Sequence, residues 1–416
     1  MQKPELILPG GSPEKMDFAY MYGGDTVYMG ITGFSMRSRI NDFSPEQLEE
    51  SVKKAHSMGK KVYVTTNIFP HNSKIEAFRR HIKWLSTIKP DALIVATPGV
   101  FSLIKEEYPD AKIHISVQAN SMNYQDVKFW HSLGAKRVVL PRELSLNEIK
   151  EIHDKVPEME LETFVHGAIC VAYSGRCLMS NYMTMREANQ GICAQSCRWK
   201  YKVYLEEEKR PGQYMPIEED DEGTYFFNAR DLCALPYIKD LIDAGVQGFK
   251  VEGRSKSIYY LATVARAYRK AIDNLMEGKE YDQALMDELL KIGHRGYSPG
   301  FLKGKYDEHD IHYEKNEPIQ SHKFIGVVRD IKKVEGVDMC EVEIRNRVEN
   351  GAEVEIMTPD KVYKTTIKSI LEKGGAETEA AHGGAGNKFV KFADDVPVNS
   401  FVRASVAEGE GIGDSE

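Results

Sequence analysis

The sequence predicts an α/β chain built on a TIM-like (β/α)8 barrel, and three observations lead to this fold class. Eight short apolar segments recur at regular spacing up to Val251. They lack the polar and apolar alternation of half-exposed strands, as expected for parallel strands that are covered on both faces. Helix start and stop signals lie between most of them. An open, doubly wound sheet with helices on both faces is the alternative interpretation.

The predicted strands are, in order, Leu6–Leu8, Thr26–Met29, Val62–Thr65, Ala92–Val95, Ile113–Val117, Arg137–Leu140, Leu161–Val165 and Gly248–Val251. The regular spacing is broken between the seventh and eighth strands, where a cysteine-rich insertion of about 166–231 intervenes. Loops that follow the strands of a (β/α)8 barrel lie at its catalytic face. We therefore expect this insertion to overhang the barrel mouth.

Helix boundaries are predicted from capping residues. Serine and an acidic or amide residue three positions later form capping-box patterns at 44–47, 73–76 and 145–148, and Ser12-Pro13 begins the first helix. A glycine just before a strand is the left-handed cap that a helix-to-strand turn prefers. Such glycines stand at Gly23, Gly59, Gly134 and Gly245.

The composition changes after the barrel. We assign residues 1–305 to the barrel, 306–317 to a linker, 318–405 to a small β-barrel domain and 406–416 to a disordered tail. The domain is predicted from six short strand patterns: Lys323–Val328, Met339–Ile344, Glu353–Met357, Lys364–Ile370, Phe389–Phe392 and Ser400–Val402.

Composition and charge limit the classes of function. The formal net charge is −8, which argues against broad, nonspecific binding of nucleic acid, although a local basic patch can still bind RNA. No apolar run approaches the length that crosses a membrane. The N-terminal residues lack the pattern of a secretory leader. We expect a cytoplasmic protein that contacts no membrane.

Four of the six cysteines lie close together, at Cys170, Cys177, Cys193 and Cys197. Disulfides need an oxidising compartment, which nothing in the sequence indicates. Zinc usually takes two closely spaced pairs, whereas only the last two cysteines are that close. An iron–sulfur cluster takes four thiolates at varied spacing. The spacing alone leaves an iron–sulfur cluster, zinc and unconnected thiols open.

Three stretches of the sequence resemble the signature of the U32 peptidase family. Two of them contain these cysteines, and the third lies downstream. They are Glu162-x-Phe164-x2-Gly167-Ala168-Ile169-Cys170-x4-Gly175-x-Cys177-x-Met179-Ser180, Asn189-Gln190-Gly191-x-Cys193-x3-Cys197-Arg198, and Lys250-Val251-Glu252-Gly253-Arg254. Within the family, the chain is most similar to the branch that hydroxylates tRNA.

The resemblance implies a function and a cofactor. It implies conversion of a wobble uridine to 5-hydroxyuridine, with prephenate as co-substrate, the tRNA anticodon arm as partner and a related U32 paralogue as a further candidate partner. It also implies a [4Fe-4S] cluster held by the four clustered cysteines, with Cys233 competing with Cys197 for the fourth position. A collagenase-type peptidase and an iron–sulfur accessory protein of another hydroxylation pathway are the alternatives.

Polar residues directly after the predicted strands form the candidate ligand site. Guanidinium groups at a barrel mouth suit a small dicarboxylate, and amides supply further hydrogen bonds. We select Arg142, Arg254, Gln118 and Asn67 as substrate-binding residues. His166 and Glu252 are the catalytic candidates. Salt bridges at the barrel rim and a packed rim histidine are the structural alternatives.

Two further patterns bear on the substrate. Basic residues alternate with aromatic residues in a patch of the kind that binds RNA, with a solvated strand face as the alternative: Arg198, Trp199, Lys200, Tyr201 and Lys202. Protease motifs are missing, since the sequence contains neither His-Glu-x-x-His nor Gly-x-Ser-x-Gly. The sequence therefore favours RNA modification over proteolysis.

Overall fold

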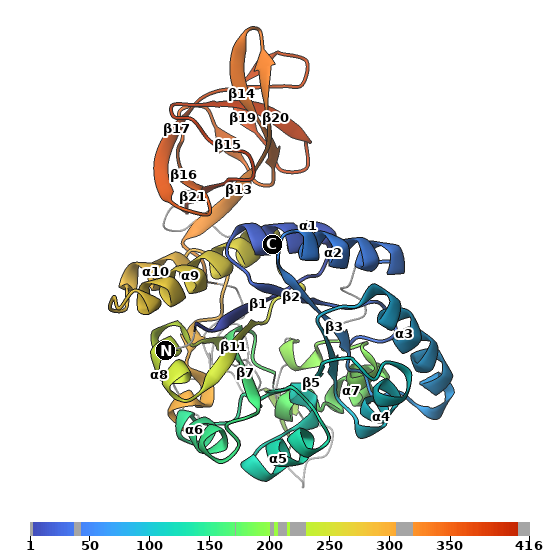
Figure 1. Ribbon diagram of the computed structural model, residues 1–416. Coiled ribbons are helices and arrows are strands. Elements are labelled where there is room, and N and C mark those ends of the chain that lie inside the picture. The colour runs from blue at the N-terminus through green and yellow to red at the C-terminus, as the bar shows by residue number, and fades with distance from the viewer. Residues whose placement is uncertain are drawn as a thin grey trace.

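The N-terminal part of the chain is a closed parallel barrel, which confirms the predicted fold class and excludes the open sheet (Figure 1). The computed structural model describes residues 3–36, 43–170, 172–199, 204–206, 214–216, 230–304 and 319–406. Parallel pairing runs from β11 through β1 to β7, and β11 also pairs with β7, which closes the barrel. The strands are β1 Glu5–Pro9, β2 Thr26–Met29, β3 Lys61–Thr66, β4 Ala92–Val95, β5 Ile113–Ile115, β6 Arg137–Val139, β7 Glu160–Gly167 and β11 Val246–Val251.

Each barrel strand is apolar on both faces because one face meets helices and the other meets the barrel axis. Leu6 and Leu8 of β1 belong to the large core between strands and helices. Ile7, between them, packs inside the barrel with Tyr28 and Tyr63. Successive strand side chains point to opposite faces. The continuous apolar runs of the sequence follow from this double burial.

Helices surround the barrel in the expected order: α1 Pro13–Met21, α2 Pro45–Ser57, α3 Ile75–Ile88, α4 Pro98–Glu107, α5 Tyr124–Ser132, α6 Leu146–Lys155, α8 Ile238–Asp243, α9 Ile258–Met276 and α10 Gln283–Leu289. The capping boxes of Ser44 and Ser145 are confirmed. The box predicted at 73–76 is wrong, because Asn72–Lys74 form a 3-10 turn and no side chain caps α3. Positive φ angles confirm the four predicted caps: Gly23, Gly59, Gly134 and Gly245. Within the described ranges, no helix is both long and apolar enough to cross a bilayer.

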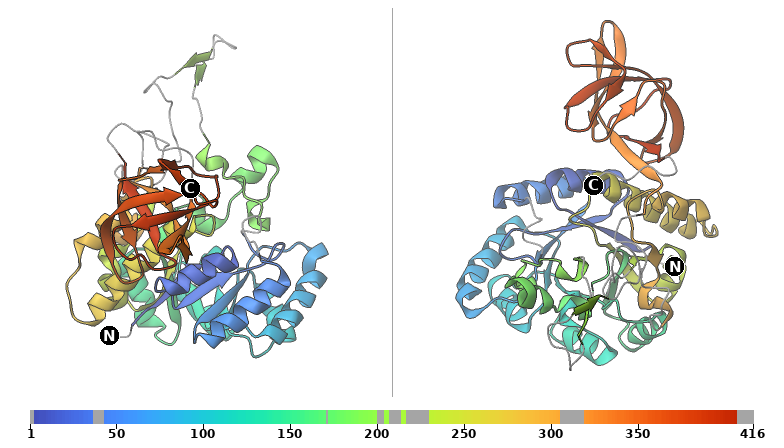
Figure 2. Two further views of the ribbon diagram at one scale, coloured as in Figure 1. Left: turned by 90° about the horizontal axis from the view of Figure 1, so that it is seen from above. Right: turned by 180° about the vertical axis from the view of Figure 1, so that it is seen from behind.

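The insertion after β7 lies at the carboxyl end of the barrel and protrudes from it (Figure 2). Its described elements are η4 Tyr173–Gly175, α7 Met179–Thr184, η5 Ala188–Gln190, η6 Ser196–Arg198, β8 Tyr204–Glu206 and β9 Tyr214–Pro216. The chain returns through β10, Asp231–Cys233, which the sequence analysis missed. β10 pairs antiparallel with the end of β7 and parallel with β12, Tyr297–Ser298. The cysteine loop is therefore anchored to the barrel wall where it leaves and where it returns.

The C-terminal part is a small antiparallel barrel, as predicted. Its strands pair in the order β16-β21-β13-β14-β20-β17, and β16 pairs again with β17. They are β13 His322–Val334, β14 Val337–Ile344, β16 Glu353–Met357, β17 Val362–Leu371, β20 Asn387–Phe392 and β21 Phe401–Ser405. A separate apolar core fills this domain. The predicted linker, 306–317, lies outside the described residues, as does the predicted tail beyond its first residue.

The β domain packs against the outside of the barrel, over α1, α9 and α10 (Figure 1). The hydroxyl of Tyr22 reaches the carbonyl oxygens of Met357 and Asn399 at 3.1 and 2.9 Å. Arg403 is 0% exposed, and its guanidinium lies 2.8 Å from the carboxylates of both Glu288 and Glu355. These buried polar contacts hold the two domains in one relative position.

Candidate functional site

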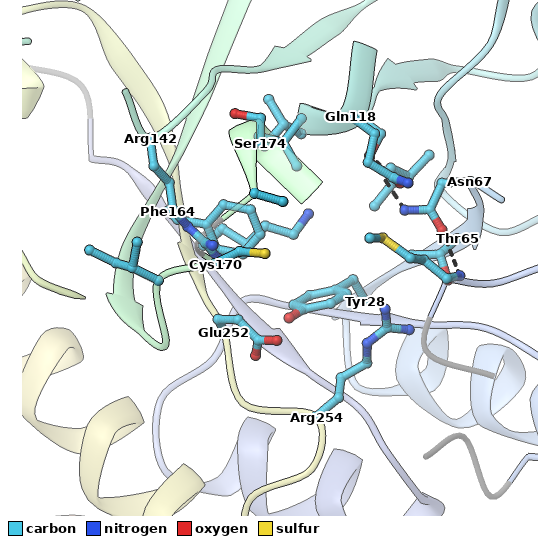
Figure 3. A pocket seen from close by; sticks show the side chains of 18 of the residues that line it. Tyr28, Thr65, Asn67, Gln118, Arg142, Phe164, Cys170, Ser174, Glu252 and Arg254 are labelled. Atoms are coloured by element: carbon cyan, nitrogen blue, oxygen red, sulfur yellow. Dashed lines mark hydrogen bonds between the residues drawn. The ribbon is translucent and has the colours of Figure 1, made fainter. Parts of the chain in front are cut away.

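A cavity of about 130 Å³ lies at the barrel mouth, where the carboxyl ends of the strands converge (Figure 3). Five of the residues selected from the sequence line it together: Asn67, Gln118, Arg142, Glu252 and Arg254. Its other lining side chains include Tyr28, Thr65, Ser116, Phe164, Cys170, Ser174 and Lys250. The position after each strand was therefore a sound guide to the residues that face this cavity.

One wall of the cavity is a chain of neutral polar groups. The Asn67 amide donates to the Ser116 hydroxyl at 3.4 Å, and that hydroxyl lies 3.4 Å from Gln118 Oε1. Gln118 is 0% exposed, and its Nε2 has no hydrogen-bond partner among the described residues. A buried amide donor is costly to leave unpaired. Gln118 Nε2 is therefore suited to an acceptor oxygen of a bound molecule.

The other walls carry cationic groups supported by aromatic rings. The guanidinium of Arg142 lies 4.0 Å from the centre of the Phe164 ring. Arg254 donates to the Ser35 hydroxyl at 2.9 Å and lies 5.4 Å from the centre of the Tyr28 ring. Guanidinium groups held in this way present planar donors to carboxylates. The cavity therefore suits a small anion that also has an apolar face.

Lys250 is a third cation in this cavity, and the sequence analysis did not select it. Its Nζ lies 2.6 Å from Glu162 Oε1 and 4.5 Å from the centre of the Tyr28 ring. Burial lowers the pKa of Lys250, Glu162 opposes this shift, and Arg254 and Arg137 add to it. Lys250 lies within β11 and not after it, so a search of strand ends passes over it. Lys250 lies between Phe249 and Val251, which belong to the core between strands and helices. Because successive strand side chains point to opposite faces, this pattern would have placed Lys250 on the inner face.

A buried ion network continues from Lys250 along the barrel axis. Glu162 is 0% exposed, and its second oxygen lies 3.2 Å from Arg137. Arg137 also pairs with Glu5 and Glu160, at 2.8 and 2.7 Å. Glu162 thus pairs with two cations inside the barrel. Glu162 links Lys250 to Arg137, which also holds Glu5 and Glu160. These linked ion pairs fix the position of Lys250 at the cavity.

His166 lies behind the barrel wall and is not among the residues that line the mouth cavity. Its ring is fully buried beside Tyr260, Tyr268 and Tyr297, and Nδ1 lies 3.4 Å from the Tyr268 hydroxyl. Burial lowers the pKa of His166 to about 3. This placement matches the packed histidine that the sequence analysis weighed against a catalytic role.

Replacing His166 with phenylalanine is expected to reduce the acid sensitivity of folding. Between pH 6.5 and about 3 the unfolded chain binds a proton at this residue and the folded chain does not, so stability falls as pH falls. In the wild-type protein, this residue should lower the free energy of unfolding by about 2 kcal/mol between pH 6.5 and 5, and the substitution should remove that decrease. Urea unfolding at pH 8, 6.5 and 5 checks this, and the pH 8 value isolates the packing cost. An unchanged pH slope together with lost activity would instead favour a catalytic role.

The four clustered cysteines line one small cavity of about 40 Å³ in the insertion: Cys170, Cys177, Cys193 and Cys197. Asn189 braces the loop, since its side chain exchanges hydrogen bonds with the backbone of Cys177 at 3.4 and 3.3 Å. Among the described residues, no three His, Cys, Asp or Glu side chains are grouped closely enough to hold one metal ion. The thiols therefore surround a common space without converging on a single point.

Cys170 connects this space with two other cavities. It lines the mouth cavity and also a more polar cavity of about 300 Å³. Arg142 and Glu252 are shared by the mouth cavity and the polar cavity as well. The polar cavity is further lined by Cys193, Cys197, Lys256, His294 and Arg295. The cysteine loop and the barrel mouth thus form one continuous site.

Comparisons with known proteins agree with this architecture. Residues 11–312 match the model of peptidase family U32, and residues 320–403 match that of the peptidase family U32 C-terminal domain. The chain belongs to peptidase family U32. A Haemophilus influenzae relative named tRNA hydroxylation protein P is 40% identical, with 95% of each chain covered. The Escherichia coli protein of the same name is 39% identical, with 96% of each chain covered. The Escherichia coli 23S rRNA 5-hydroxycytidine C2501 synthase is 31% identical, over 89% of this chain and 55% of its own.

The U32 signature residues have identifiable structural roles in this chain. Gly167 ends β7 at φ +106°, and a Cβ there would lie 2.5 Å from the carbonyl oxygen of Glu252. A side chain at this position would push the β11 end away from the cysteine loop.

Cys233 is buried in the barrel core with its Sγ 3.8 Å from the Tyr268 hydroxyl, and burial raises the pKa of its thiol to about 11. It does not line the four-cysteine cavity.

The RNA-binding residues proposed from the sequence fall at the edge of what the structure describes. Lys200 and Lys202 lie outside the described residues, and so does the side chain of Arg198. In this U32 chain, the described part of the insertion instead exposes large side chains on and beside α7. Leu178 is 77%, Tyr182 91% and Met185 89% exposed.

Proposed function

We propose that the protein hydroxylates a wobble uridine of tRNA to 5-hydroxyuridine, with prephenate as co-substrate and a [4Fe-4S] cluster as cofactor. One observation carries the proposal: Cys170 lines both the mouth cavity and the four-cysteine cavity. The cofactor and the small ligand would therefore meet across one side chain. The relatives named tRNA hydroxylation protein P support RNA as the substrate, because they align with nearly the whole chain.

The donor set fits an iron–sulfur cluster, because such clusters are held by four cysteine thiolates at varied spacing. The four thiols share one cavity. Cys170, Cys177, Cys193 and Cys197 would hold the cluster, and Cys233 would remain in the core. When bound, the cluster supplies one-electron chemistry beside the barrel mouth.

The mouth cavity fits a ring that bears two carboxylates, which is the chemistry of prephenate. Arg142 and Arg254 would each bind a carboxylate, and Gln118 Nε2 would donate to a further oxygen. Tyr28 and Phe164, which line the same cavity, would supply apolar contacts to the ring. Binding would satisfy the unpaired amide, which gives the site a preference for oxygen-rich ligands over apolar ones.

The RNA would approach over the cysteine loop and reach the mouth through the adjoining polar cavity. Bases stack readily on exposed aromatic side chains, and Tyr182 on α7 is almost fully exposed. Residues 172–199 contain three arginines and one acidic residue, whereas the whole chain has a net charge of −8. These arginines would offer guanidinium groups to the phosphate backbone.

Nucleoside mass spectrometry of tRNA tests the proposal. A strain that lacks the gene should lose 5-hydroxyuridine, and the wild-type gene should restore it. Arg142→Ala should restore roughly a tenth or less, because a charge-assisted contact is worth about 1.5–3 kcal/mol. Tyr182→Ala should reduce the level in part, by weakening RNA binding. Arg347→Ala, an exposed arginine of the β domain, is the matched control and should restore the nucleoside in full.

Two outcomes would contradict the proposal. Unchanged 5-hydroxyuridine in the deletion strain would remove tRNA hydroxylation as the function. Unchanged nucleosides together with altered proteolysis would favour the peptidase that the family name suggests. An accessory role in another hydroxylation pathway would also leave tRNA nucleosides unchanged.

A further inference from the structure

Lys250 is placed as a reactive amine and not only as a counter-ion. It is 4% exposed, yet it lines the mouth cavity together with Arg142 and Arg254. Its ammonium group lies over the Tyr28 ring and against Glu162. Within the barrel, Glu162 already has a second cation, since Arg137 lies 3.2 Å from its other oxygen. Glu162 therefore keeps a cationic neighbour when Lys250 gives up its proton.

The electrostatic surroundings ease release of a proton from Lys250. Two guanidinium groups, those of Arg254 and Arg137, act on the same ammonium, which is itself almost fully buried. Burial and these cations lower the pKa of Lys250, while Glu162 opposes them. A buried lysine of this kind is a nucleophile toward carbonyl carbon. The guanidinium groups at the cavity wall define the rest of the ligand, which must carry a carboxylate near its carbonyl.

We propose that Lys250 forms an imine with an α-keto acid bound in the mouth cavity. Glu162 takes a proton from the Lys250 ammonium, and the free Nζ attacks the keto carbon. As the C–N bond forms, the second bond of the carbonyl breaks and Glu162 passes its proton to the keto oxygen. A second Nζ proton reaches the same oxygen through Glu162, the oxygen leaves as water, and the C=N bond forms. The product is a protonated imine beside the Glu162 carboxylate, and no oxidant or reductant is consumed.

The inference deepens the proposed function without depending on it. Prephenate carries a keto group beside one of its carboxylates, so it belongs to the ligand class that the cavity selects. Any other α-keto acid of suitable size would be held in the same way. The geometry alone thus assigns the cavity to a ligand class, whatever the RNA substrate is.

Reductive trapping tests the imine directly. The anaerobically purified full-length protein is incubated with pyruvate and sodium cyanoborohydride, and modified lysines are located by peptide mass spectrometry. The adduct should form at Lys250 and should saturate as pyruvate is raised. It should exceed labelling of Lys256, which lines the neighbouring polar cavity, by roughly tenfold. Lys150→Arg, a change at an exposed lysine of α6, should leave the Lys250 adduct unchanged, whereas Arg142→Ala should reduce it by weakening carboxylate binding.

Two labelling results would overturn the inference. Absence of a Lys250 adduct in folded wild-type protein, or unsaturable labelling spread over surface lysines, would show that the amine is only an ion-pair partner. Lys250→Arg keeps the positive charge and cannot form an imine, so it should abolish trapping while circular dichroism confirms the fold. Because wild-type trapping needs no variant, poor folding of Lys250→Arg would not weaken the test. Trapping also uses no RNA, so its failure is distinguishable from a failure of tRNA hydroxylation.

Discussion

Replacement of Cys197 with serine should remove most of the iron from anaerobically purified protein. Cys197 shares a cavity with Cys170, Cys177 and Cys193, so its loss breaks the proposed four-thiolate set. Loss of a residue that only orients a metal ligand already lowers affinity by about 10–100-fold, so loss of a ligand itself should lower iron and sulfide per chain at least tenfold. The brown colour of the cluster should fade with it, and 5-hydroxyuridine should not be restored in cells.

The matched control is Cys233→Ser, which should keep its iron. Cys233 lies in the barrel core beside Tyr268, outside the four-cysteine cavity, and its thiol has a raised pKa. A thiolate ligand would need the opposite shift. Iron loss in Cys233→Ser with iron retained in Cys197→Ser would reverse the ligand assignment. Zinc in place of iron in the wild-type protein would end the cluster proposal.

Replacement of Glu162 with glutamine should destabilise the barrel more than any other single change proposed for the strands. The carboxylate is 0% exposed and pairs with both Lys250 and Arg137. Removing its charge leaves the buried Lys250 ammonium without its carboxylate partner, while Arg137 keeps Glu5 and Glu160, and breaking a buried pair in this way typically costs about 3–5 kcal/mol. Urea unfolding followed by circular dichroism measures the change. Ligand binding should weaken too, because Lys250 would no longer be held beneath the cavity.

Glu160→Gln provides the control for this prediction. Glu160 pairs with the same Arg137 at 2.7 Å, but its side chain is 47% exposed. An exposed partner is screened by water, so the expected loss is about 1 kcal/mol or less. Equal losses for the two variants would mean that burial does not set the strength of this network.

Much of the barrel could be predicted because parallel strands buried on both faces leave an unambiguous sequence pattern. Thr26–Met29 and Ala92–Val95 match their observed strands residue for residue. The capping boxes at Ser44 and Ser145 satisfy backbone amides locally, so they too can be recognised without tertiary information. The box at 73–76 fails because a 3-10 turn competes for the same residues.

The parts that escaped prediction depend on register and tertiary contacts. His166 and Lys250 lie on neighbouring strands, but only the barrel geometry shows that one faces α9 and the other faces the axis. β10 is three residues long and forms by pairing with β7, so its sequence carries no strand signal of its own. That Cys197 and not Cys233 shares a cavity with the other three cysteines likewise depends on the folded chain, because thiol spacing does not show which side chains lie together.

The contact between the two domains has a consequence for binding. Arg403 is fully enclosed among Glu288, Glu355 and Tyr259, so the β domain cannot move away without breaking the buried pair between Arg403 and Glu288. A molecule that touched both domains at once would therefore meet two surfaces at a fixed distance from each other.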